Sequence, residues 1–153
     1  MRHVYFSGQA NDILQKLGCK KINFKNFIIV NDNKLFLKEG YDIKLKSKQG
    51  GFYLGRIKAK QDYYNINFFR ILYEFNKDNK DVNVIRLEQR KAFLFVCGRD
   101  VIEYEMRKGQ LFFVLDDFGN FIGVAKKLGN IYKNILDIGI FLFDQSFSNA
   151  LVV

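Results

Sequence analysis

The stretch LFFVLDDFGNFIGVAKK, residues 111–127, decides the fold predicted for the second half of the chain. Its first apolar run has no polar interruption, which is typical of a strand buried on both faces, as inside a small barrel. Residues 117–120, Asp-Phe-Gly-Asn, predict a turn, and FIGVAKK predicts the returning strand. The strands of a buried hairpin are apolar, so its charged residues lie at the strand ends. Lys126 and Lys127 are therefore either a solvated terminus or a contact for phosphates.

The segments around this hairpin complete a predicted barrel over residues 83–153. VIRLE and DVIEYEM are expected to be strands, and QRKAFLFVCG a short helix with Ala92, Phe95 and Val96 inward and Gly98 past its end. ILDIGIFLFD is expected to be the closing strand, joined to FIGVAKK by the connection LGNIYKN. The apolar end, FSNALVV, either packs on the barrel or contacts a protein partner. Closely spaced short strands favour a compact barrel.

The first half predicts an α/β arrangement. Ser7 is the expected N-cap of a helix whose apolar residues follow helical spacing up to Gly18. Two β-rich runs flank Asn-Asp-Asn at residues 31–33, a hairpin signal. FYLGRIKAK is a further predicted strand, in which Gly55 marks a bulge or a close backbone approach, and YYNIN extends the sheet. A second helix follows from Phe68 onwards, whereas GYDIKLKSK fits either a strand or a helix.

The polar segment NKDNKDVN, residues 76–83, is the best candidate for a domain boundary. We therefore expect an α+β protein, with an N-terminal α/β domain over residues 1–81 and a β-barrel domain over residues 82–153. No apolar run is long enough to cross a bilayer, and MRHVYFSGQANDILQKLG does not have the continuous apolar core of a secretory signal. We expect an intracellular protein that does not bind membranes.

The composition favours a polyanionic partner. The chain of 153 residues has 25 Lys and Arg against 16 Asp and Glu, a net charge of +9. Such a balance suits nucleic acid, although charge also serves solubility. Cys19 and Cys97 lie far apart and His3 is the single histidine, so we expect no metal site and two cysteines that pack in the interior.

The second half resembles a known RNA-binding module. FVCGRDV, a hydrophobic strand, DDFGNFIGVA and ILDIGIFL follow one another in the order seen in PUA domains, over roughly residues 83–145. GFYLGRI and NVIRLEQRKAFLFVCGRDV extend the likeness, and the chain resembles the archaeal and eukaryotic Nip-seven family from about Phe24 to Asp144. The resemblance implies a pre-PUA α/β domain, a PUA-like barrel and a helix in GYDIKLKSK. It also implies a non-enzymatic role, RNA binding in ribosome assembly, alongside other assembly or exosome proteins.

The chain departs from that family in its charge distribution. Residues 83–153 hold nine basic and eight acidic residues, whereas residues 1–82 hold sixteen and eight. The N-terminal helical region is shortened, and the connection LGNIYKN is sparse in basic residues. Lys133 stands where relatives place basic residues that contact RNA, next to Gly129, Asn130 and Leu136.

Two basic groups are the candidate RNA-binding residues. Arg99, Lys126, Lys127 and Lys133 are predicted to line one rim of the barrel and to meet phosphates, with Gly98 allowing close approach. A second group alternates on a predicted strand beside Tyr63 and Tyr64, as single-stranded RNA grooves require: Arg56, Lys58 and Lys60. Because the excess charge lies in the first half, we expect the second group to supply a large share of the affinity. A solvated basic face remains the alternative.

The sequence gives little support for catalysis. Asp116 and Asp117 are neighbours at a turn, where adjacent side chains diverge, and we find no phosphate-binding glycine loop or credible Ser-His-Asp arrangement. The predicted function is RNA binding in rRNA processing or large-subunit assembly, without enzyme activity, cofactor or small-molecule substrate. The expected location is cytoplasmic, or nucleolar in a eukaryote. Two alternatives stay open: an accessory subunit that guides an RNA-modifying enzyme, and a protein-interaction adaptor whose barrel has lost RNA affinity.

Overall fold

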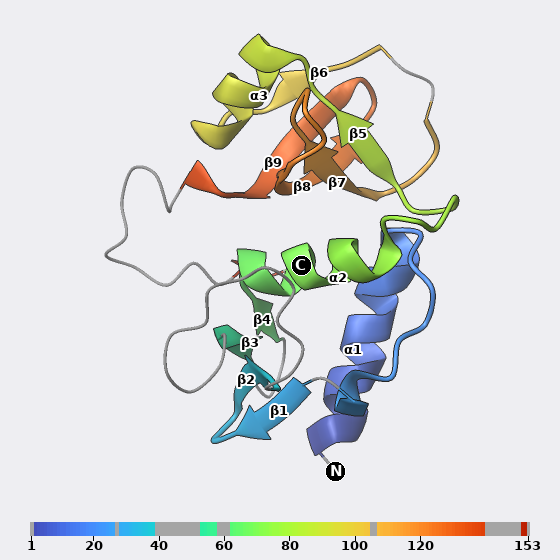
Figure 1. Cartoon of the computed structure of the whole chain (residues 1–153), viewed down its shortest axis with the longest axis vertical. Coiled ribbons are helices and arrows are strands. Elements are labelled where there is room, and N and C mark those ends of the chain that lie inside the picture. The colour runs from blue at the N-terminus through green and yellow to red at the C-terminus, as the bar shows by residue number, and fades with distance from the viewer. Residues whose placement is uncertain are drawn as a thin grey trace.

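The protein has a mixed α/β fold with two five-stranded sheets and three α-helices in its described part (Figure 1). The computed structural model describes residues 2–26, 28–38, 53–57, 62–104, 107–139 and 151–152. Within them no helix has both the length and the apolar character needed to span a membrane. Lys58, Lys60 and the ambiguous segment GYDIKLKSK lie outside these ranges.

The first helix begins earlier than predicted. Helix α1 spans Arg2–Lys16, so Ser7 lies inside it and is not the N-cap. Residues 2–6 contain neither glycine nor proline, and nothing in their backbone chemistry ends a helix there. The predicted apolar side of the helix is confirmed, because Ala10, Ile13, Leu14 and Leu17 are all buried. The predicted stop is also confirmed, since Gly18 adopts a φ of 73° just past the helix.

The first sheet has the order β1-β2-β3-β4-β10. After a short 3₁₀ turn, η1 (Phe24–Asn26), the predicted hairpin forms from β1 (Ile28–Asn31) and β2 (Lys34–Leu37). Its turn residues Asp32 and Asn33 have positive φ angles of 51° and 62°, as a tight two-residue hairpin turn requires. Strand β3 (Tyr53–Arg56) and the short β4 (Tyr63–Tyr64) continue the sheet. A side chain at Gly55 would meet the Tyr63 carbonyl oxygen at 2.1 Å, which confirms the predicted close approach.

The last strand belongs to this first sheet. Strand β10 (Leu151–Val152) pairs antiparallel with β4, so the expectation that the C-terminal segment packs on the barrel is wrong for these residues. The physical reason is that β4 would otherwise present unpaired backbone groups at the sheet edge, and β10 satisfies them.

Helix α2 (Ile66–Asn76) lies between the two sheets (Figure 1). The Asn65 side chain caps it, accepting hydrogen bonds from the backbone of Asn67 at 3.0 Å and Phe68 at 3.3 Å. Toward the first sheet, the Phe68 ring stacks on Tyr64 with centroids 4.4 Å apart. Toward the second sheet, the Tyr73 ring lies 5.4 Å from that of Phe113. One hydrophobic core therefore contacts both sheets through α2. The boundary near residue 82 stays a prediction.

The second sheet has the order β5-β7-β8-β9-β6 and curls around its own core (Figure 1). Strand β5 (Val84–Arg86) runs parallel to β7, and the other neighbours are antiparallel. Strand β7 (Leu111–Leu115) is buried along its whole length, as its unbroken apolar run predicts. Its two faces contribute to two separate cores, one under α2 and one under helix α3 (Gln89–Val96). The two outer strands, β5 and β6, do not pair in the described residues, so the ladder is open there.

Three predicted elements in this sheet differ from expectation. The predicted closing strand ILDIGIFLFD begins inside β9, which ends at Asp137, and its residues 140–144 lie outside the described ranges. Strand β6 is limited to Val101–Ile102, much shorter than DVIEYEM predicts. The predicted connection LGNIYKN is not a loop: β8 (Phe121–Leu128) and β9 (Ile131–Asp137) meet through the two-residue turn Gly129-Asn130. Gly129 supplies the positive φ, 62°, that such a turn needs at its first position. The correction moves Lys133 from a loop into a strand.

The cysteines differ in their surroundings. Cys19 is half-buried against the first core, and burial raises the pKa of its thiol to about 12. This agrees with the predicted packing role. Cys97 is exposed at the end of α3, so the prediction that both cysteines pack in the interior is wrong for Cys97. The helix turns its Ala92 and Phe95 side inward, which directs position 97 to solvent.

Candidate nucleic-acid interface

The outer face of the first sheet carries two cations side by side. Lys34 on β2 is the register partner of Arg56 on β3, and Arg56 in turn pairs with Tyr63 on β4. Directly opposed residues share one face of a sheet, with Cβ atoms about 4.5–5.5 Å apart. Lys34 and Arg56 are exposed, whereas their strand neighbours Leu35 and Gly55 point to the interior. Lys34, Arg56 and Tyr63 therefore form one outward row.

Aromatic rings lie on the same sheet near this row. The rings of Phe36 and Tyr53 meet edge to face, 6.0 Å between centroids, and both side chains are partly exposed. Tyr63 is also partly exposed. Cations track phosphates and rings stack on bases, so this is the combination that single-stranded RNA requires. We call Lys34, Arg56, Phe36, Tyr53 and Tyr63 the aromatic-basic row.

The predicted group around Arg56 is only partly described. Arg56 lies on β3 beside Tyr63, as expected, and the positions of Lys58 and Lys60 stay predictions. Tyr64 does not belong to the surface. Its hydroxyl donates to the Asp62 carboxylate at 3.0 Å, and burial raises the pKa of this phenol well above its usual value. Sequence reasoning missed Lys34, because only the β2–β3 pairing brings it opposite Arg56.

The second sheet carries another opposed pair of cations. Lys126 on β8 is the register partner of Lys133 on β9, and both side chains are exposed. Neither side chain has a hydrogen bond or ion pair with any residue that the structure describes. Like charges directly opposite each other destabilise a sheet. The structure thus brings together two of the four predicted rim residues.

Lys127 lies apart from this pair. Lys127 is the register partner of Tyr132, whose side chain is buried. Successive strand residues alternate between faces, so Lys127 and Tyr132 lie on the face opposite to Lys126 and Lys133. The Lys127 ammonium donates a hydrogen bond to the backbone carbonyl of Arg107. Its charge is thus held against the backbone of a neighbouring segment, away from Lys126 and Lys133.

Arg99 lies in the loop that joins α3 to β6. Gly98, with a φ of 88°, ends the helix, and the Arg99 backbone donates to the Leu94 carbonyl at 3.1 Å. The loop is tied to β9, because the Asp100 carboxylate accepts a hydrogen bond from the Asn134 backbone at 2.8 Å. Arg99 is exposed and directly precedes Asp100. The hydrogen bond of Asp100 therefore holds the Arg99 backbone near β9, the strand that carries Lys133.

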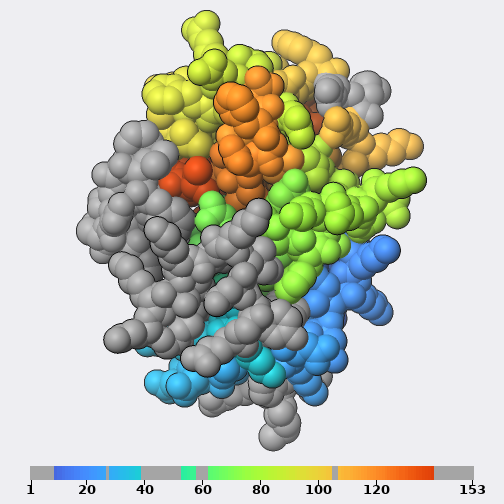
Figure 2. All heavy atoms as spheres, viewed as in Figure 1, coloured from blue at the N-terminus to red at the C-terminus, as the bar shows by residue number. Residues whose placement is uncertain are grey.

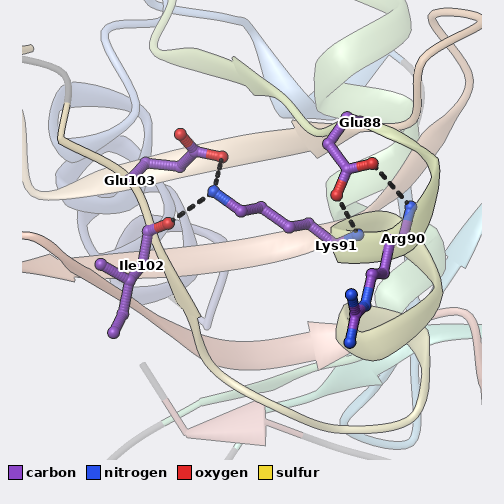
Figure 3. A network of polar contacts seen from close by, with 5 residues as sticks. All are labelled: Glu88, Arg90, Lys91, Ile102 and Glu103. Atoms are coloured by element: carbon purple, nitrogen blue, oxygen red, sulfur yellow. Dashed lines mark hydrogen bonds and ion pairs between the residues drawn. The ribbon is translucent and has the colours of Figure 1, made fainter.

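Other charges near the rim are already used within the fold. The Glu88 carboxylate caps α3 by accepting hydrogen bonds from the backbone of Arg90 and Lys91, which lowers its pKa (Figure 3). The Lys91 ammonium lies 2.9 Å from both the Glu103 carboxylate and the Ile102 carbonyl. This network ties α3 to the end of β6. On the face shown in Figure 2, α3 (yellow) and the β7–β8 segment (orange) lie side by side in the upper part, and blue atoms from the first part of the chain lie below them at the right.

The acidic turn of the opening motif is structural. The Asp116 carboxylate accepts hydrogen bonds from the backbone of Phe118 at 2.9 Å and of Asn120 at 2.8 Å. It therefore holds the β7–β8 turn closed, as predicted for a turn residue. No cluster of His, Cys, Asp and Glu suited to a metal ion occurs in the part of the chain that the structure describes.

No family model and no curated protein matches the chain. Among solved structures it is similar to a conserved PUA domain protein from Thermoplasma acidophilum, with a TM-score of 0.41 and 15% sequence identity over 96% of this chain and 88% of that chain. A likeness at this level does not establish a common fold. The PUA-like barrel and the Nip-seven family therefore stay predictions.

Proposed function

We propose that this chain is a non-catalytic RNA-binding protein that holds single-stranded RNA on the outer face of its first sheet. The observation that carries the proposal is the aromatic-basic row. Lys34 and Arg56 are opposed in register on an exposed face, beside the rings of Phe36, Tyr53 and Tyr63. A polyanion relieves the repulsion of the two cations, and the rings accept unpaired bases.

The charge distribution supports this assignment. Residues 1–82 hold sixteen basic and eight acidic residues, so most of the net charge of +9 lies in the half that contains the first sheet. Arg99, which is exposed in the loop held against β9, provides a further phosphate contact. Lys58 and Lys60 follow β3 in sequence and are proposed to extend the phosphate contacts of the first sheet.

The cellular role that we propose is ribosome biogenesis, in rRNA processing or large-subunit assembly. Its support is the resemblance of GFYLGRI and NVIRLEQRKAFLFVCGRDV to the Nip-seven family. A cytoplasmic location, or a nucleolar one in a eukaryote, belongs to the same proposal. An accessory subunit of an RNA-modifying enzyme would use the same surface, and the RNA and the proteins recovered with the chain separate the two roles.

The binding proposal is tested by salt titration with a single-stranded oligouridylate and with an RNA duplex. We expect Lys34→Gln/Arg56→Gln to lower single-strand affinity about tenfold and to reduce the salt slope by about 1.4, the share of two phosphate contacts. Tyr53→Ala should lower single-strand affinity without changing the slope. An affinity unchanged in both variants contradicts the proposal.

The cellular role is tested by crosslinking the full chain to RNA in cells and sequencing what is attached. Pre-ribosomal RNA among the crosslinked molecules, with assembly particles in a pull-down, is the expected result. Recovery of tRNA together with a modifying enzyme favours the accessory role instead.

A further inference from the structure

The second sheet ends in an exposed apolar surface next to its lysine pair. Beyond Lys126 and Lys133, the next outward position on each strand is Leu128 on β8 and Ile131 on β9, which are register partners. Ile131 also pairs with Ile102 on β6. These three side chains keep 51%, 43% and 49% of their surface exposed. We call Ile102, Leu128, Ile131, Lys126 and Lys133 the aliphatic-basic end.

Helix α2 covers another part of the sheet face that carries Lys126 and Lys133. On the same side of the sheet, Val124 and Leu136 pair across β8 and β9 and are buried in the core that α2 shares. On β8 and β9 this coverage stops before Lys126 and Lys133, which follow about 6–7 Å further along the strands. On β7 it reaches one residue further, since Leu111, the register partner of Lys126, is still buried in that core. The opposite side at this end is closed, because Val101 and Tyr132 are buried in the core under α3. The aliphatic-basic end is therefore an uncovered continuation of a packed face.

We propose that the aliphatic-basic end binds an acidic, apolar segment of a partner protein. Apolar side chains of the segment cover Ile102, Leu128 and Ile131, and its carboxylates pair with Lys126 and Lys133. Both contributions to binding are favourable. Apolar surface is removed from water, and the two cations, which repel each other, gain opposite charges as neighbours. The Glu103 carboxylate, the acidic group next to Ile102 in the chain, is paired with Lys91 (Figure 3).

The chemistry of this end favours a protein segment over RNA. The rows that contain Lys126 and Lys133 or the three aliphatic residues have no aromatic member in the described strands. Aliphatic side chains do not provide the flat ring on which a base stacks. The aromatic-basic row of the first sheet has such rings beside its cations. The exposed ring nearest in the chain to this end, Tyr104, follows β6 and lies outside the rows that contain the two lysines.

The same end is also poorly suited to a membrane. The residues at the tip of the β8–β9 hairpin are Gly129 and Asn130, both exposed. They would enter a bilayer ahead of Leu128 and Ile131, and they bring no apolar area with them. A peripheral membrane site needs apolar side chains as its most protruding group.

The test is a phage-displayed random peptide library panned against the full chain. We expect enriched peptides to combine aliphatic with acidic residues. Their affinity should fall at least tenfold in Leu128→Thr/Ile131→Thr and in Lys126→Gln/Lys133→Gln. The matched control is Lys34→Gln/Arg56→Gln, which should bind the peptides like the wild type while losing oligouridylate affinity. Threonine keeps the strand preference, and thermal unfolding of each variant checks the fold.

The two proposals can fail separately. Peptides that bind Leu128→Thr/Ile131→Thr as tightly as wild type, or no enrichment at all, overturn the docking proposal and leave the RNA proposal untouched. Binding of oligouridylate, or of vesicles of three parts phosphatidylcholine to one part phosphatidylserine, that depends on Leu128 and Ile131 also overturns it. If Leu128→Thr/Ile131→Thr lowers the unfolding midpoint, the lysine variant decides the outcome.

Discussion

The two sheets of this protein each expose a pair of cations in register, yet the two pairs have different neighbours. Lys34 and Arg56 on the first sheet adjoin Tyr63 and lie near the contacting rings of Phe36 and Tyr53. Lys126 and Lys133 on the second sheet adjoin the aliphatic row of Ile102, Leu128 and Ile131. The two pairs therefore have the same charge, but aromatic rings adjoin the first pair and aliphatic side chains adjoin the second.

This difference teaches that a basic patch should be interpreted together with the side chains beside it. Rings offer a base a stacking surface, whereas aliphatic chains offer only area to be removed from water. Both pairs also lower the stability of their sheets, since like charges directly opposite each other are destabilising. An anionic partner for each pair would explain why one small protein contains two destabilising pairs.

The largest expected effect is a loss of folding stability, which would disturb both surfaces because one core contacts both sheets. Phe113 is fully buried between α2 and the second sheet, with its ring near Tyr73 and Phe121. Phe113→Ala should lower the free energy of unfolding by about 3–5 kcal/mol, because it leaves a cavity in the shared core. Denaturant unfolding measures it. Leu128→Ala, at an exposed position, is the matched control and should cost less than about 0.5 kcal/mol.

A smaller effect sharpens the comparison between the two pairs. Substituting Arg56, Lys58 and Lys60 together by glutamine should lower oligouridylate affinity by between about tenfold and a hundredfold, with a shallower salt slope. Lys126→Gln/Lys133→Gln should change affinity by less than this, because the aliphatic-basic end lacks rings. Filter binding at several salt concentrations gives both values. The reverse order of effects contradicts the assignment of RNA to the first sheet.

The smallest effect tests the repulsion itself. Lys133→Glu turns the opposed pair with Lys126 into an ion pair and should raise the free energy of unfolding by up to about 1 kcal/mol. Lys127→Glu is the control, since Lys127 lies on the other face and donates to the Arg107 carbonyl, and it should bring no gain. The gain should shrink in high salt, because exposed charges are screened. A loss of stability in Lys133→Glu would show that the two side chains do not repel.

Local patterns predicted much of the fold. The unbroken run LFFVL is buried along its whole length, Asp32 and Asn33 form the predicted hairpin turn, and Gly18 and Gly98 end their helices. Each of these depends on the chemistry of a few adjacent residues. The start of α1 was misplaced because serine is compatible with both a cap and a helix interior.

The candidate surfaces were harder to predict, because they depend on register. Lys34 lies opposite Arg56 only through the pairing of β2 with β3, which no local pattern specifies. LGNIYKN was interpreted as a connection, since glycine and asparagine dominate its middle, so Lys133 was not expected opposite Lys126. The aliphatic row was missed for the same reason, as its three members come from three strands.

The pairing of β10 with β4 has a consequence for synthesis of the chain. The first sheet contains residues from position 28 to position 152, with the whole second sheet between them in sequence. While the protein is being translated, the edge of β4 must wait for a strand that emerges more than eighty residues later. An unpaired edge invites association with other chains. Nascent or truncated forms that stop before residue 151 should accordingly need protection that the complete fold does not.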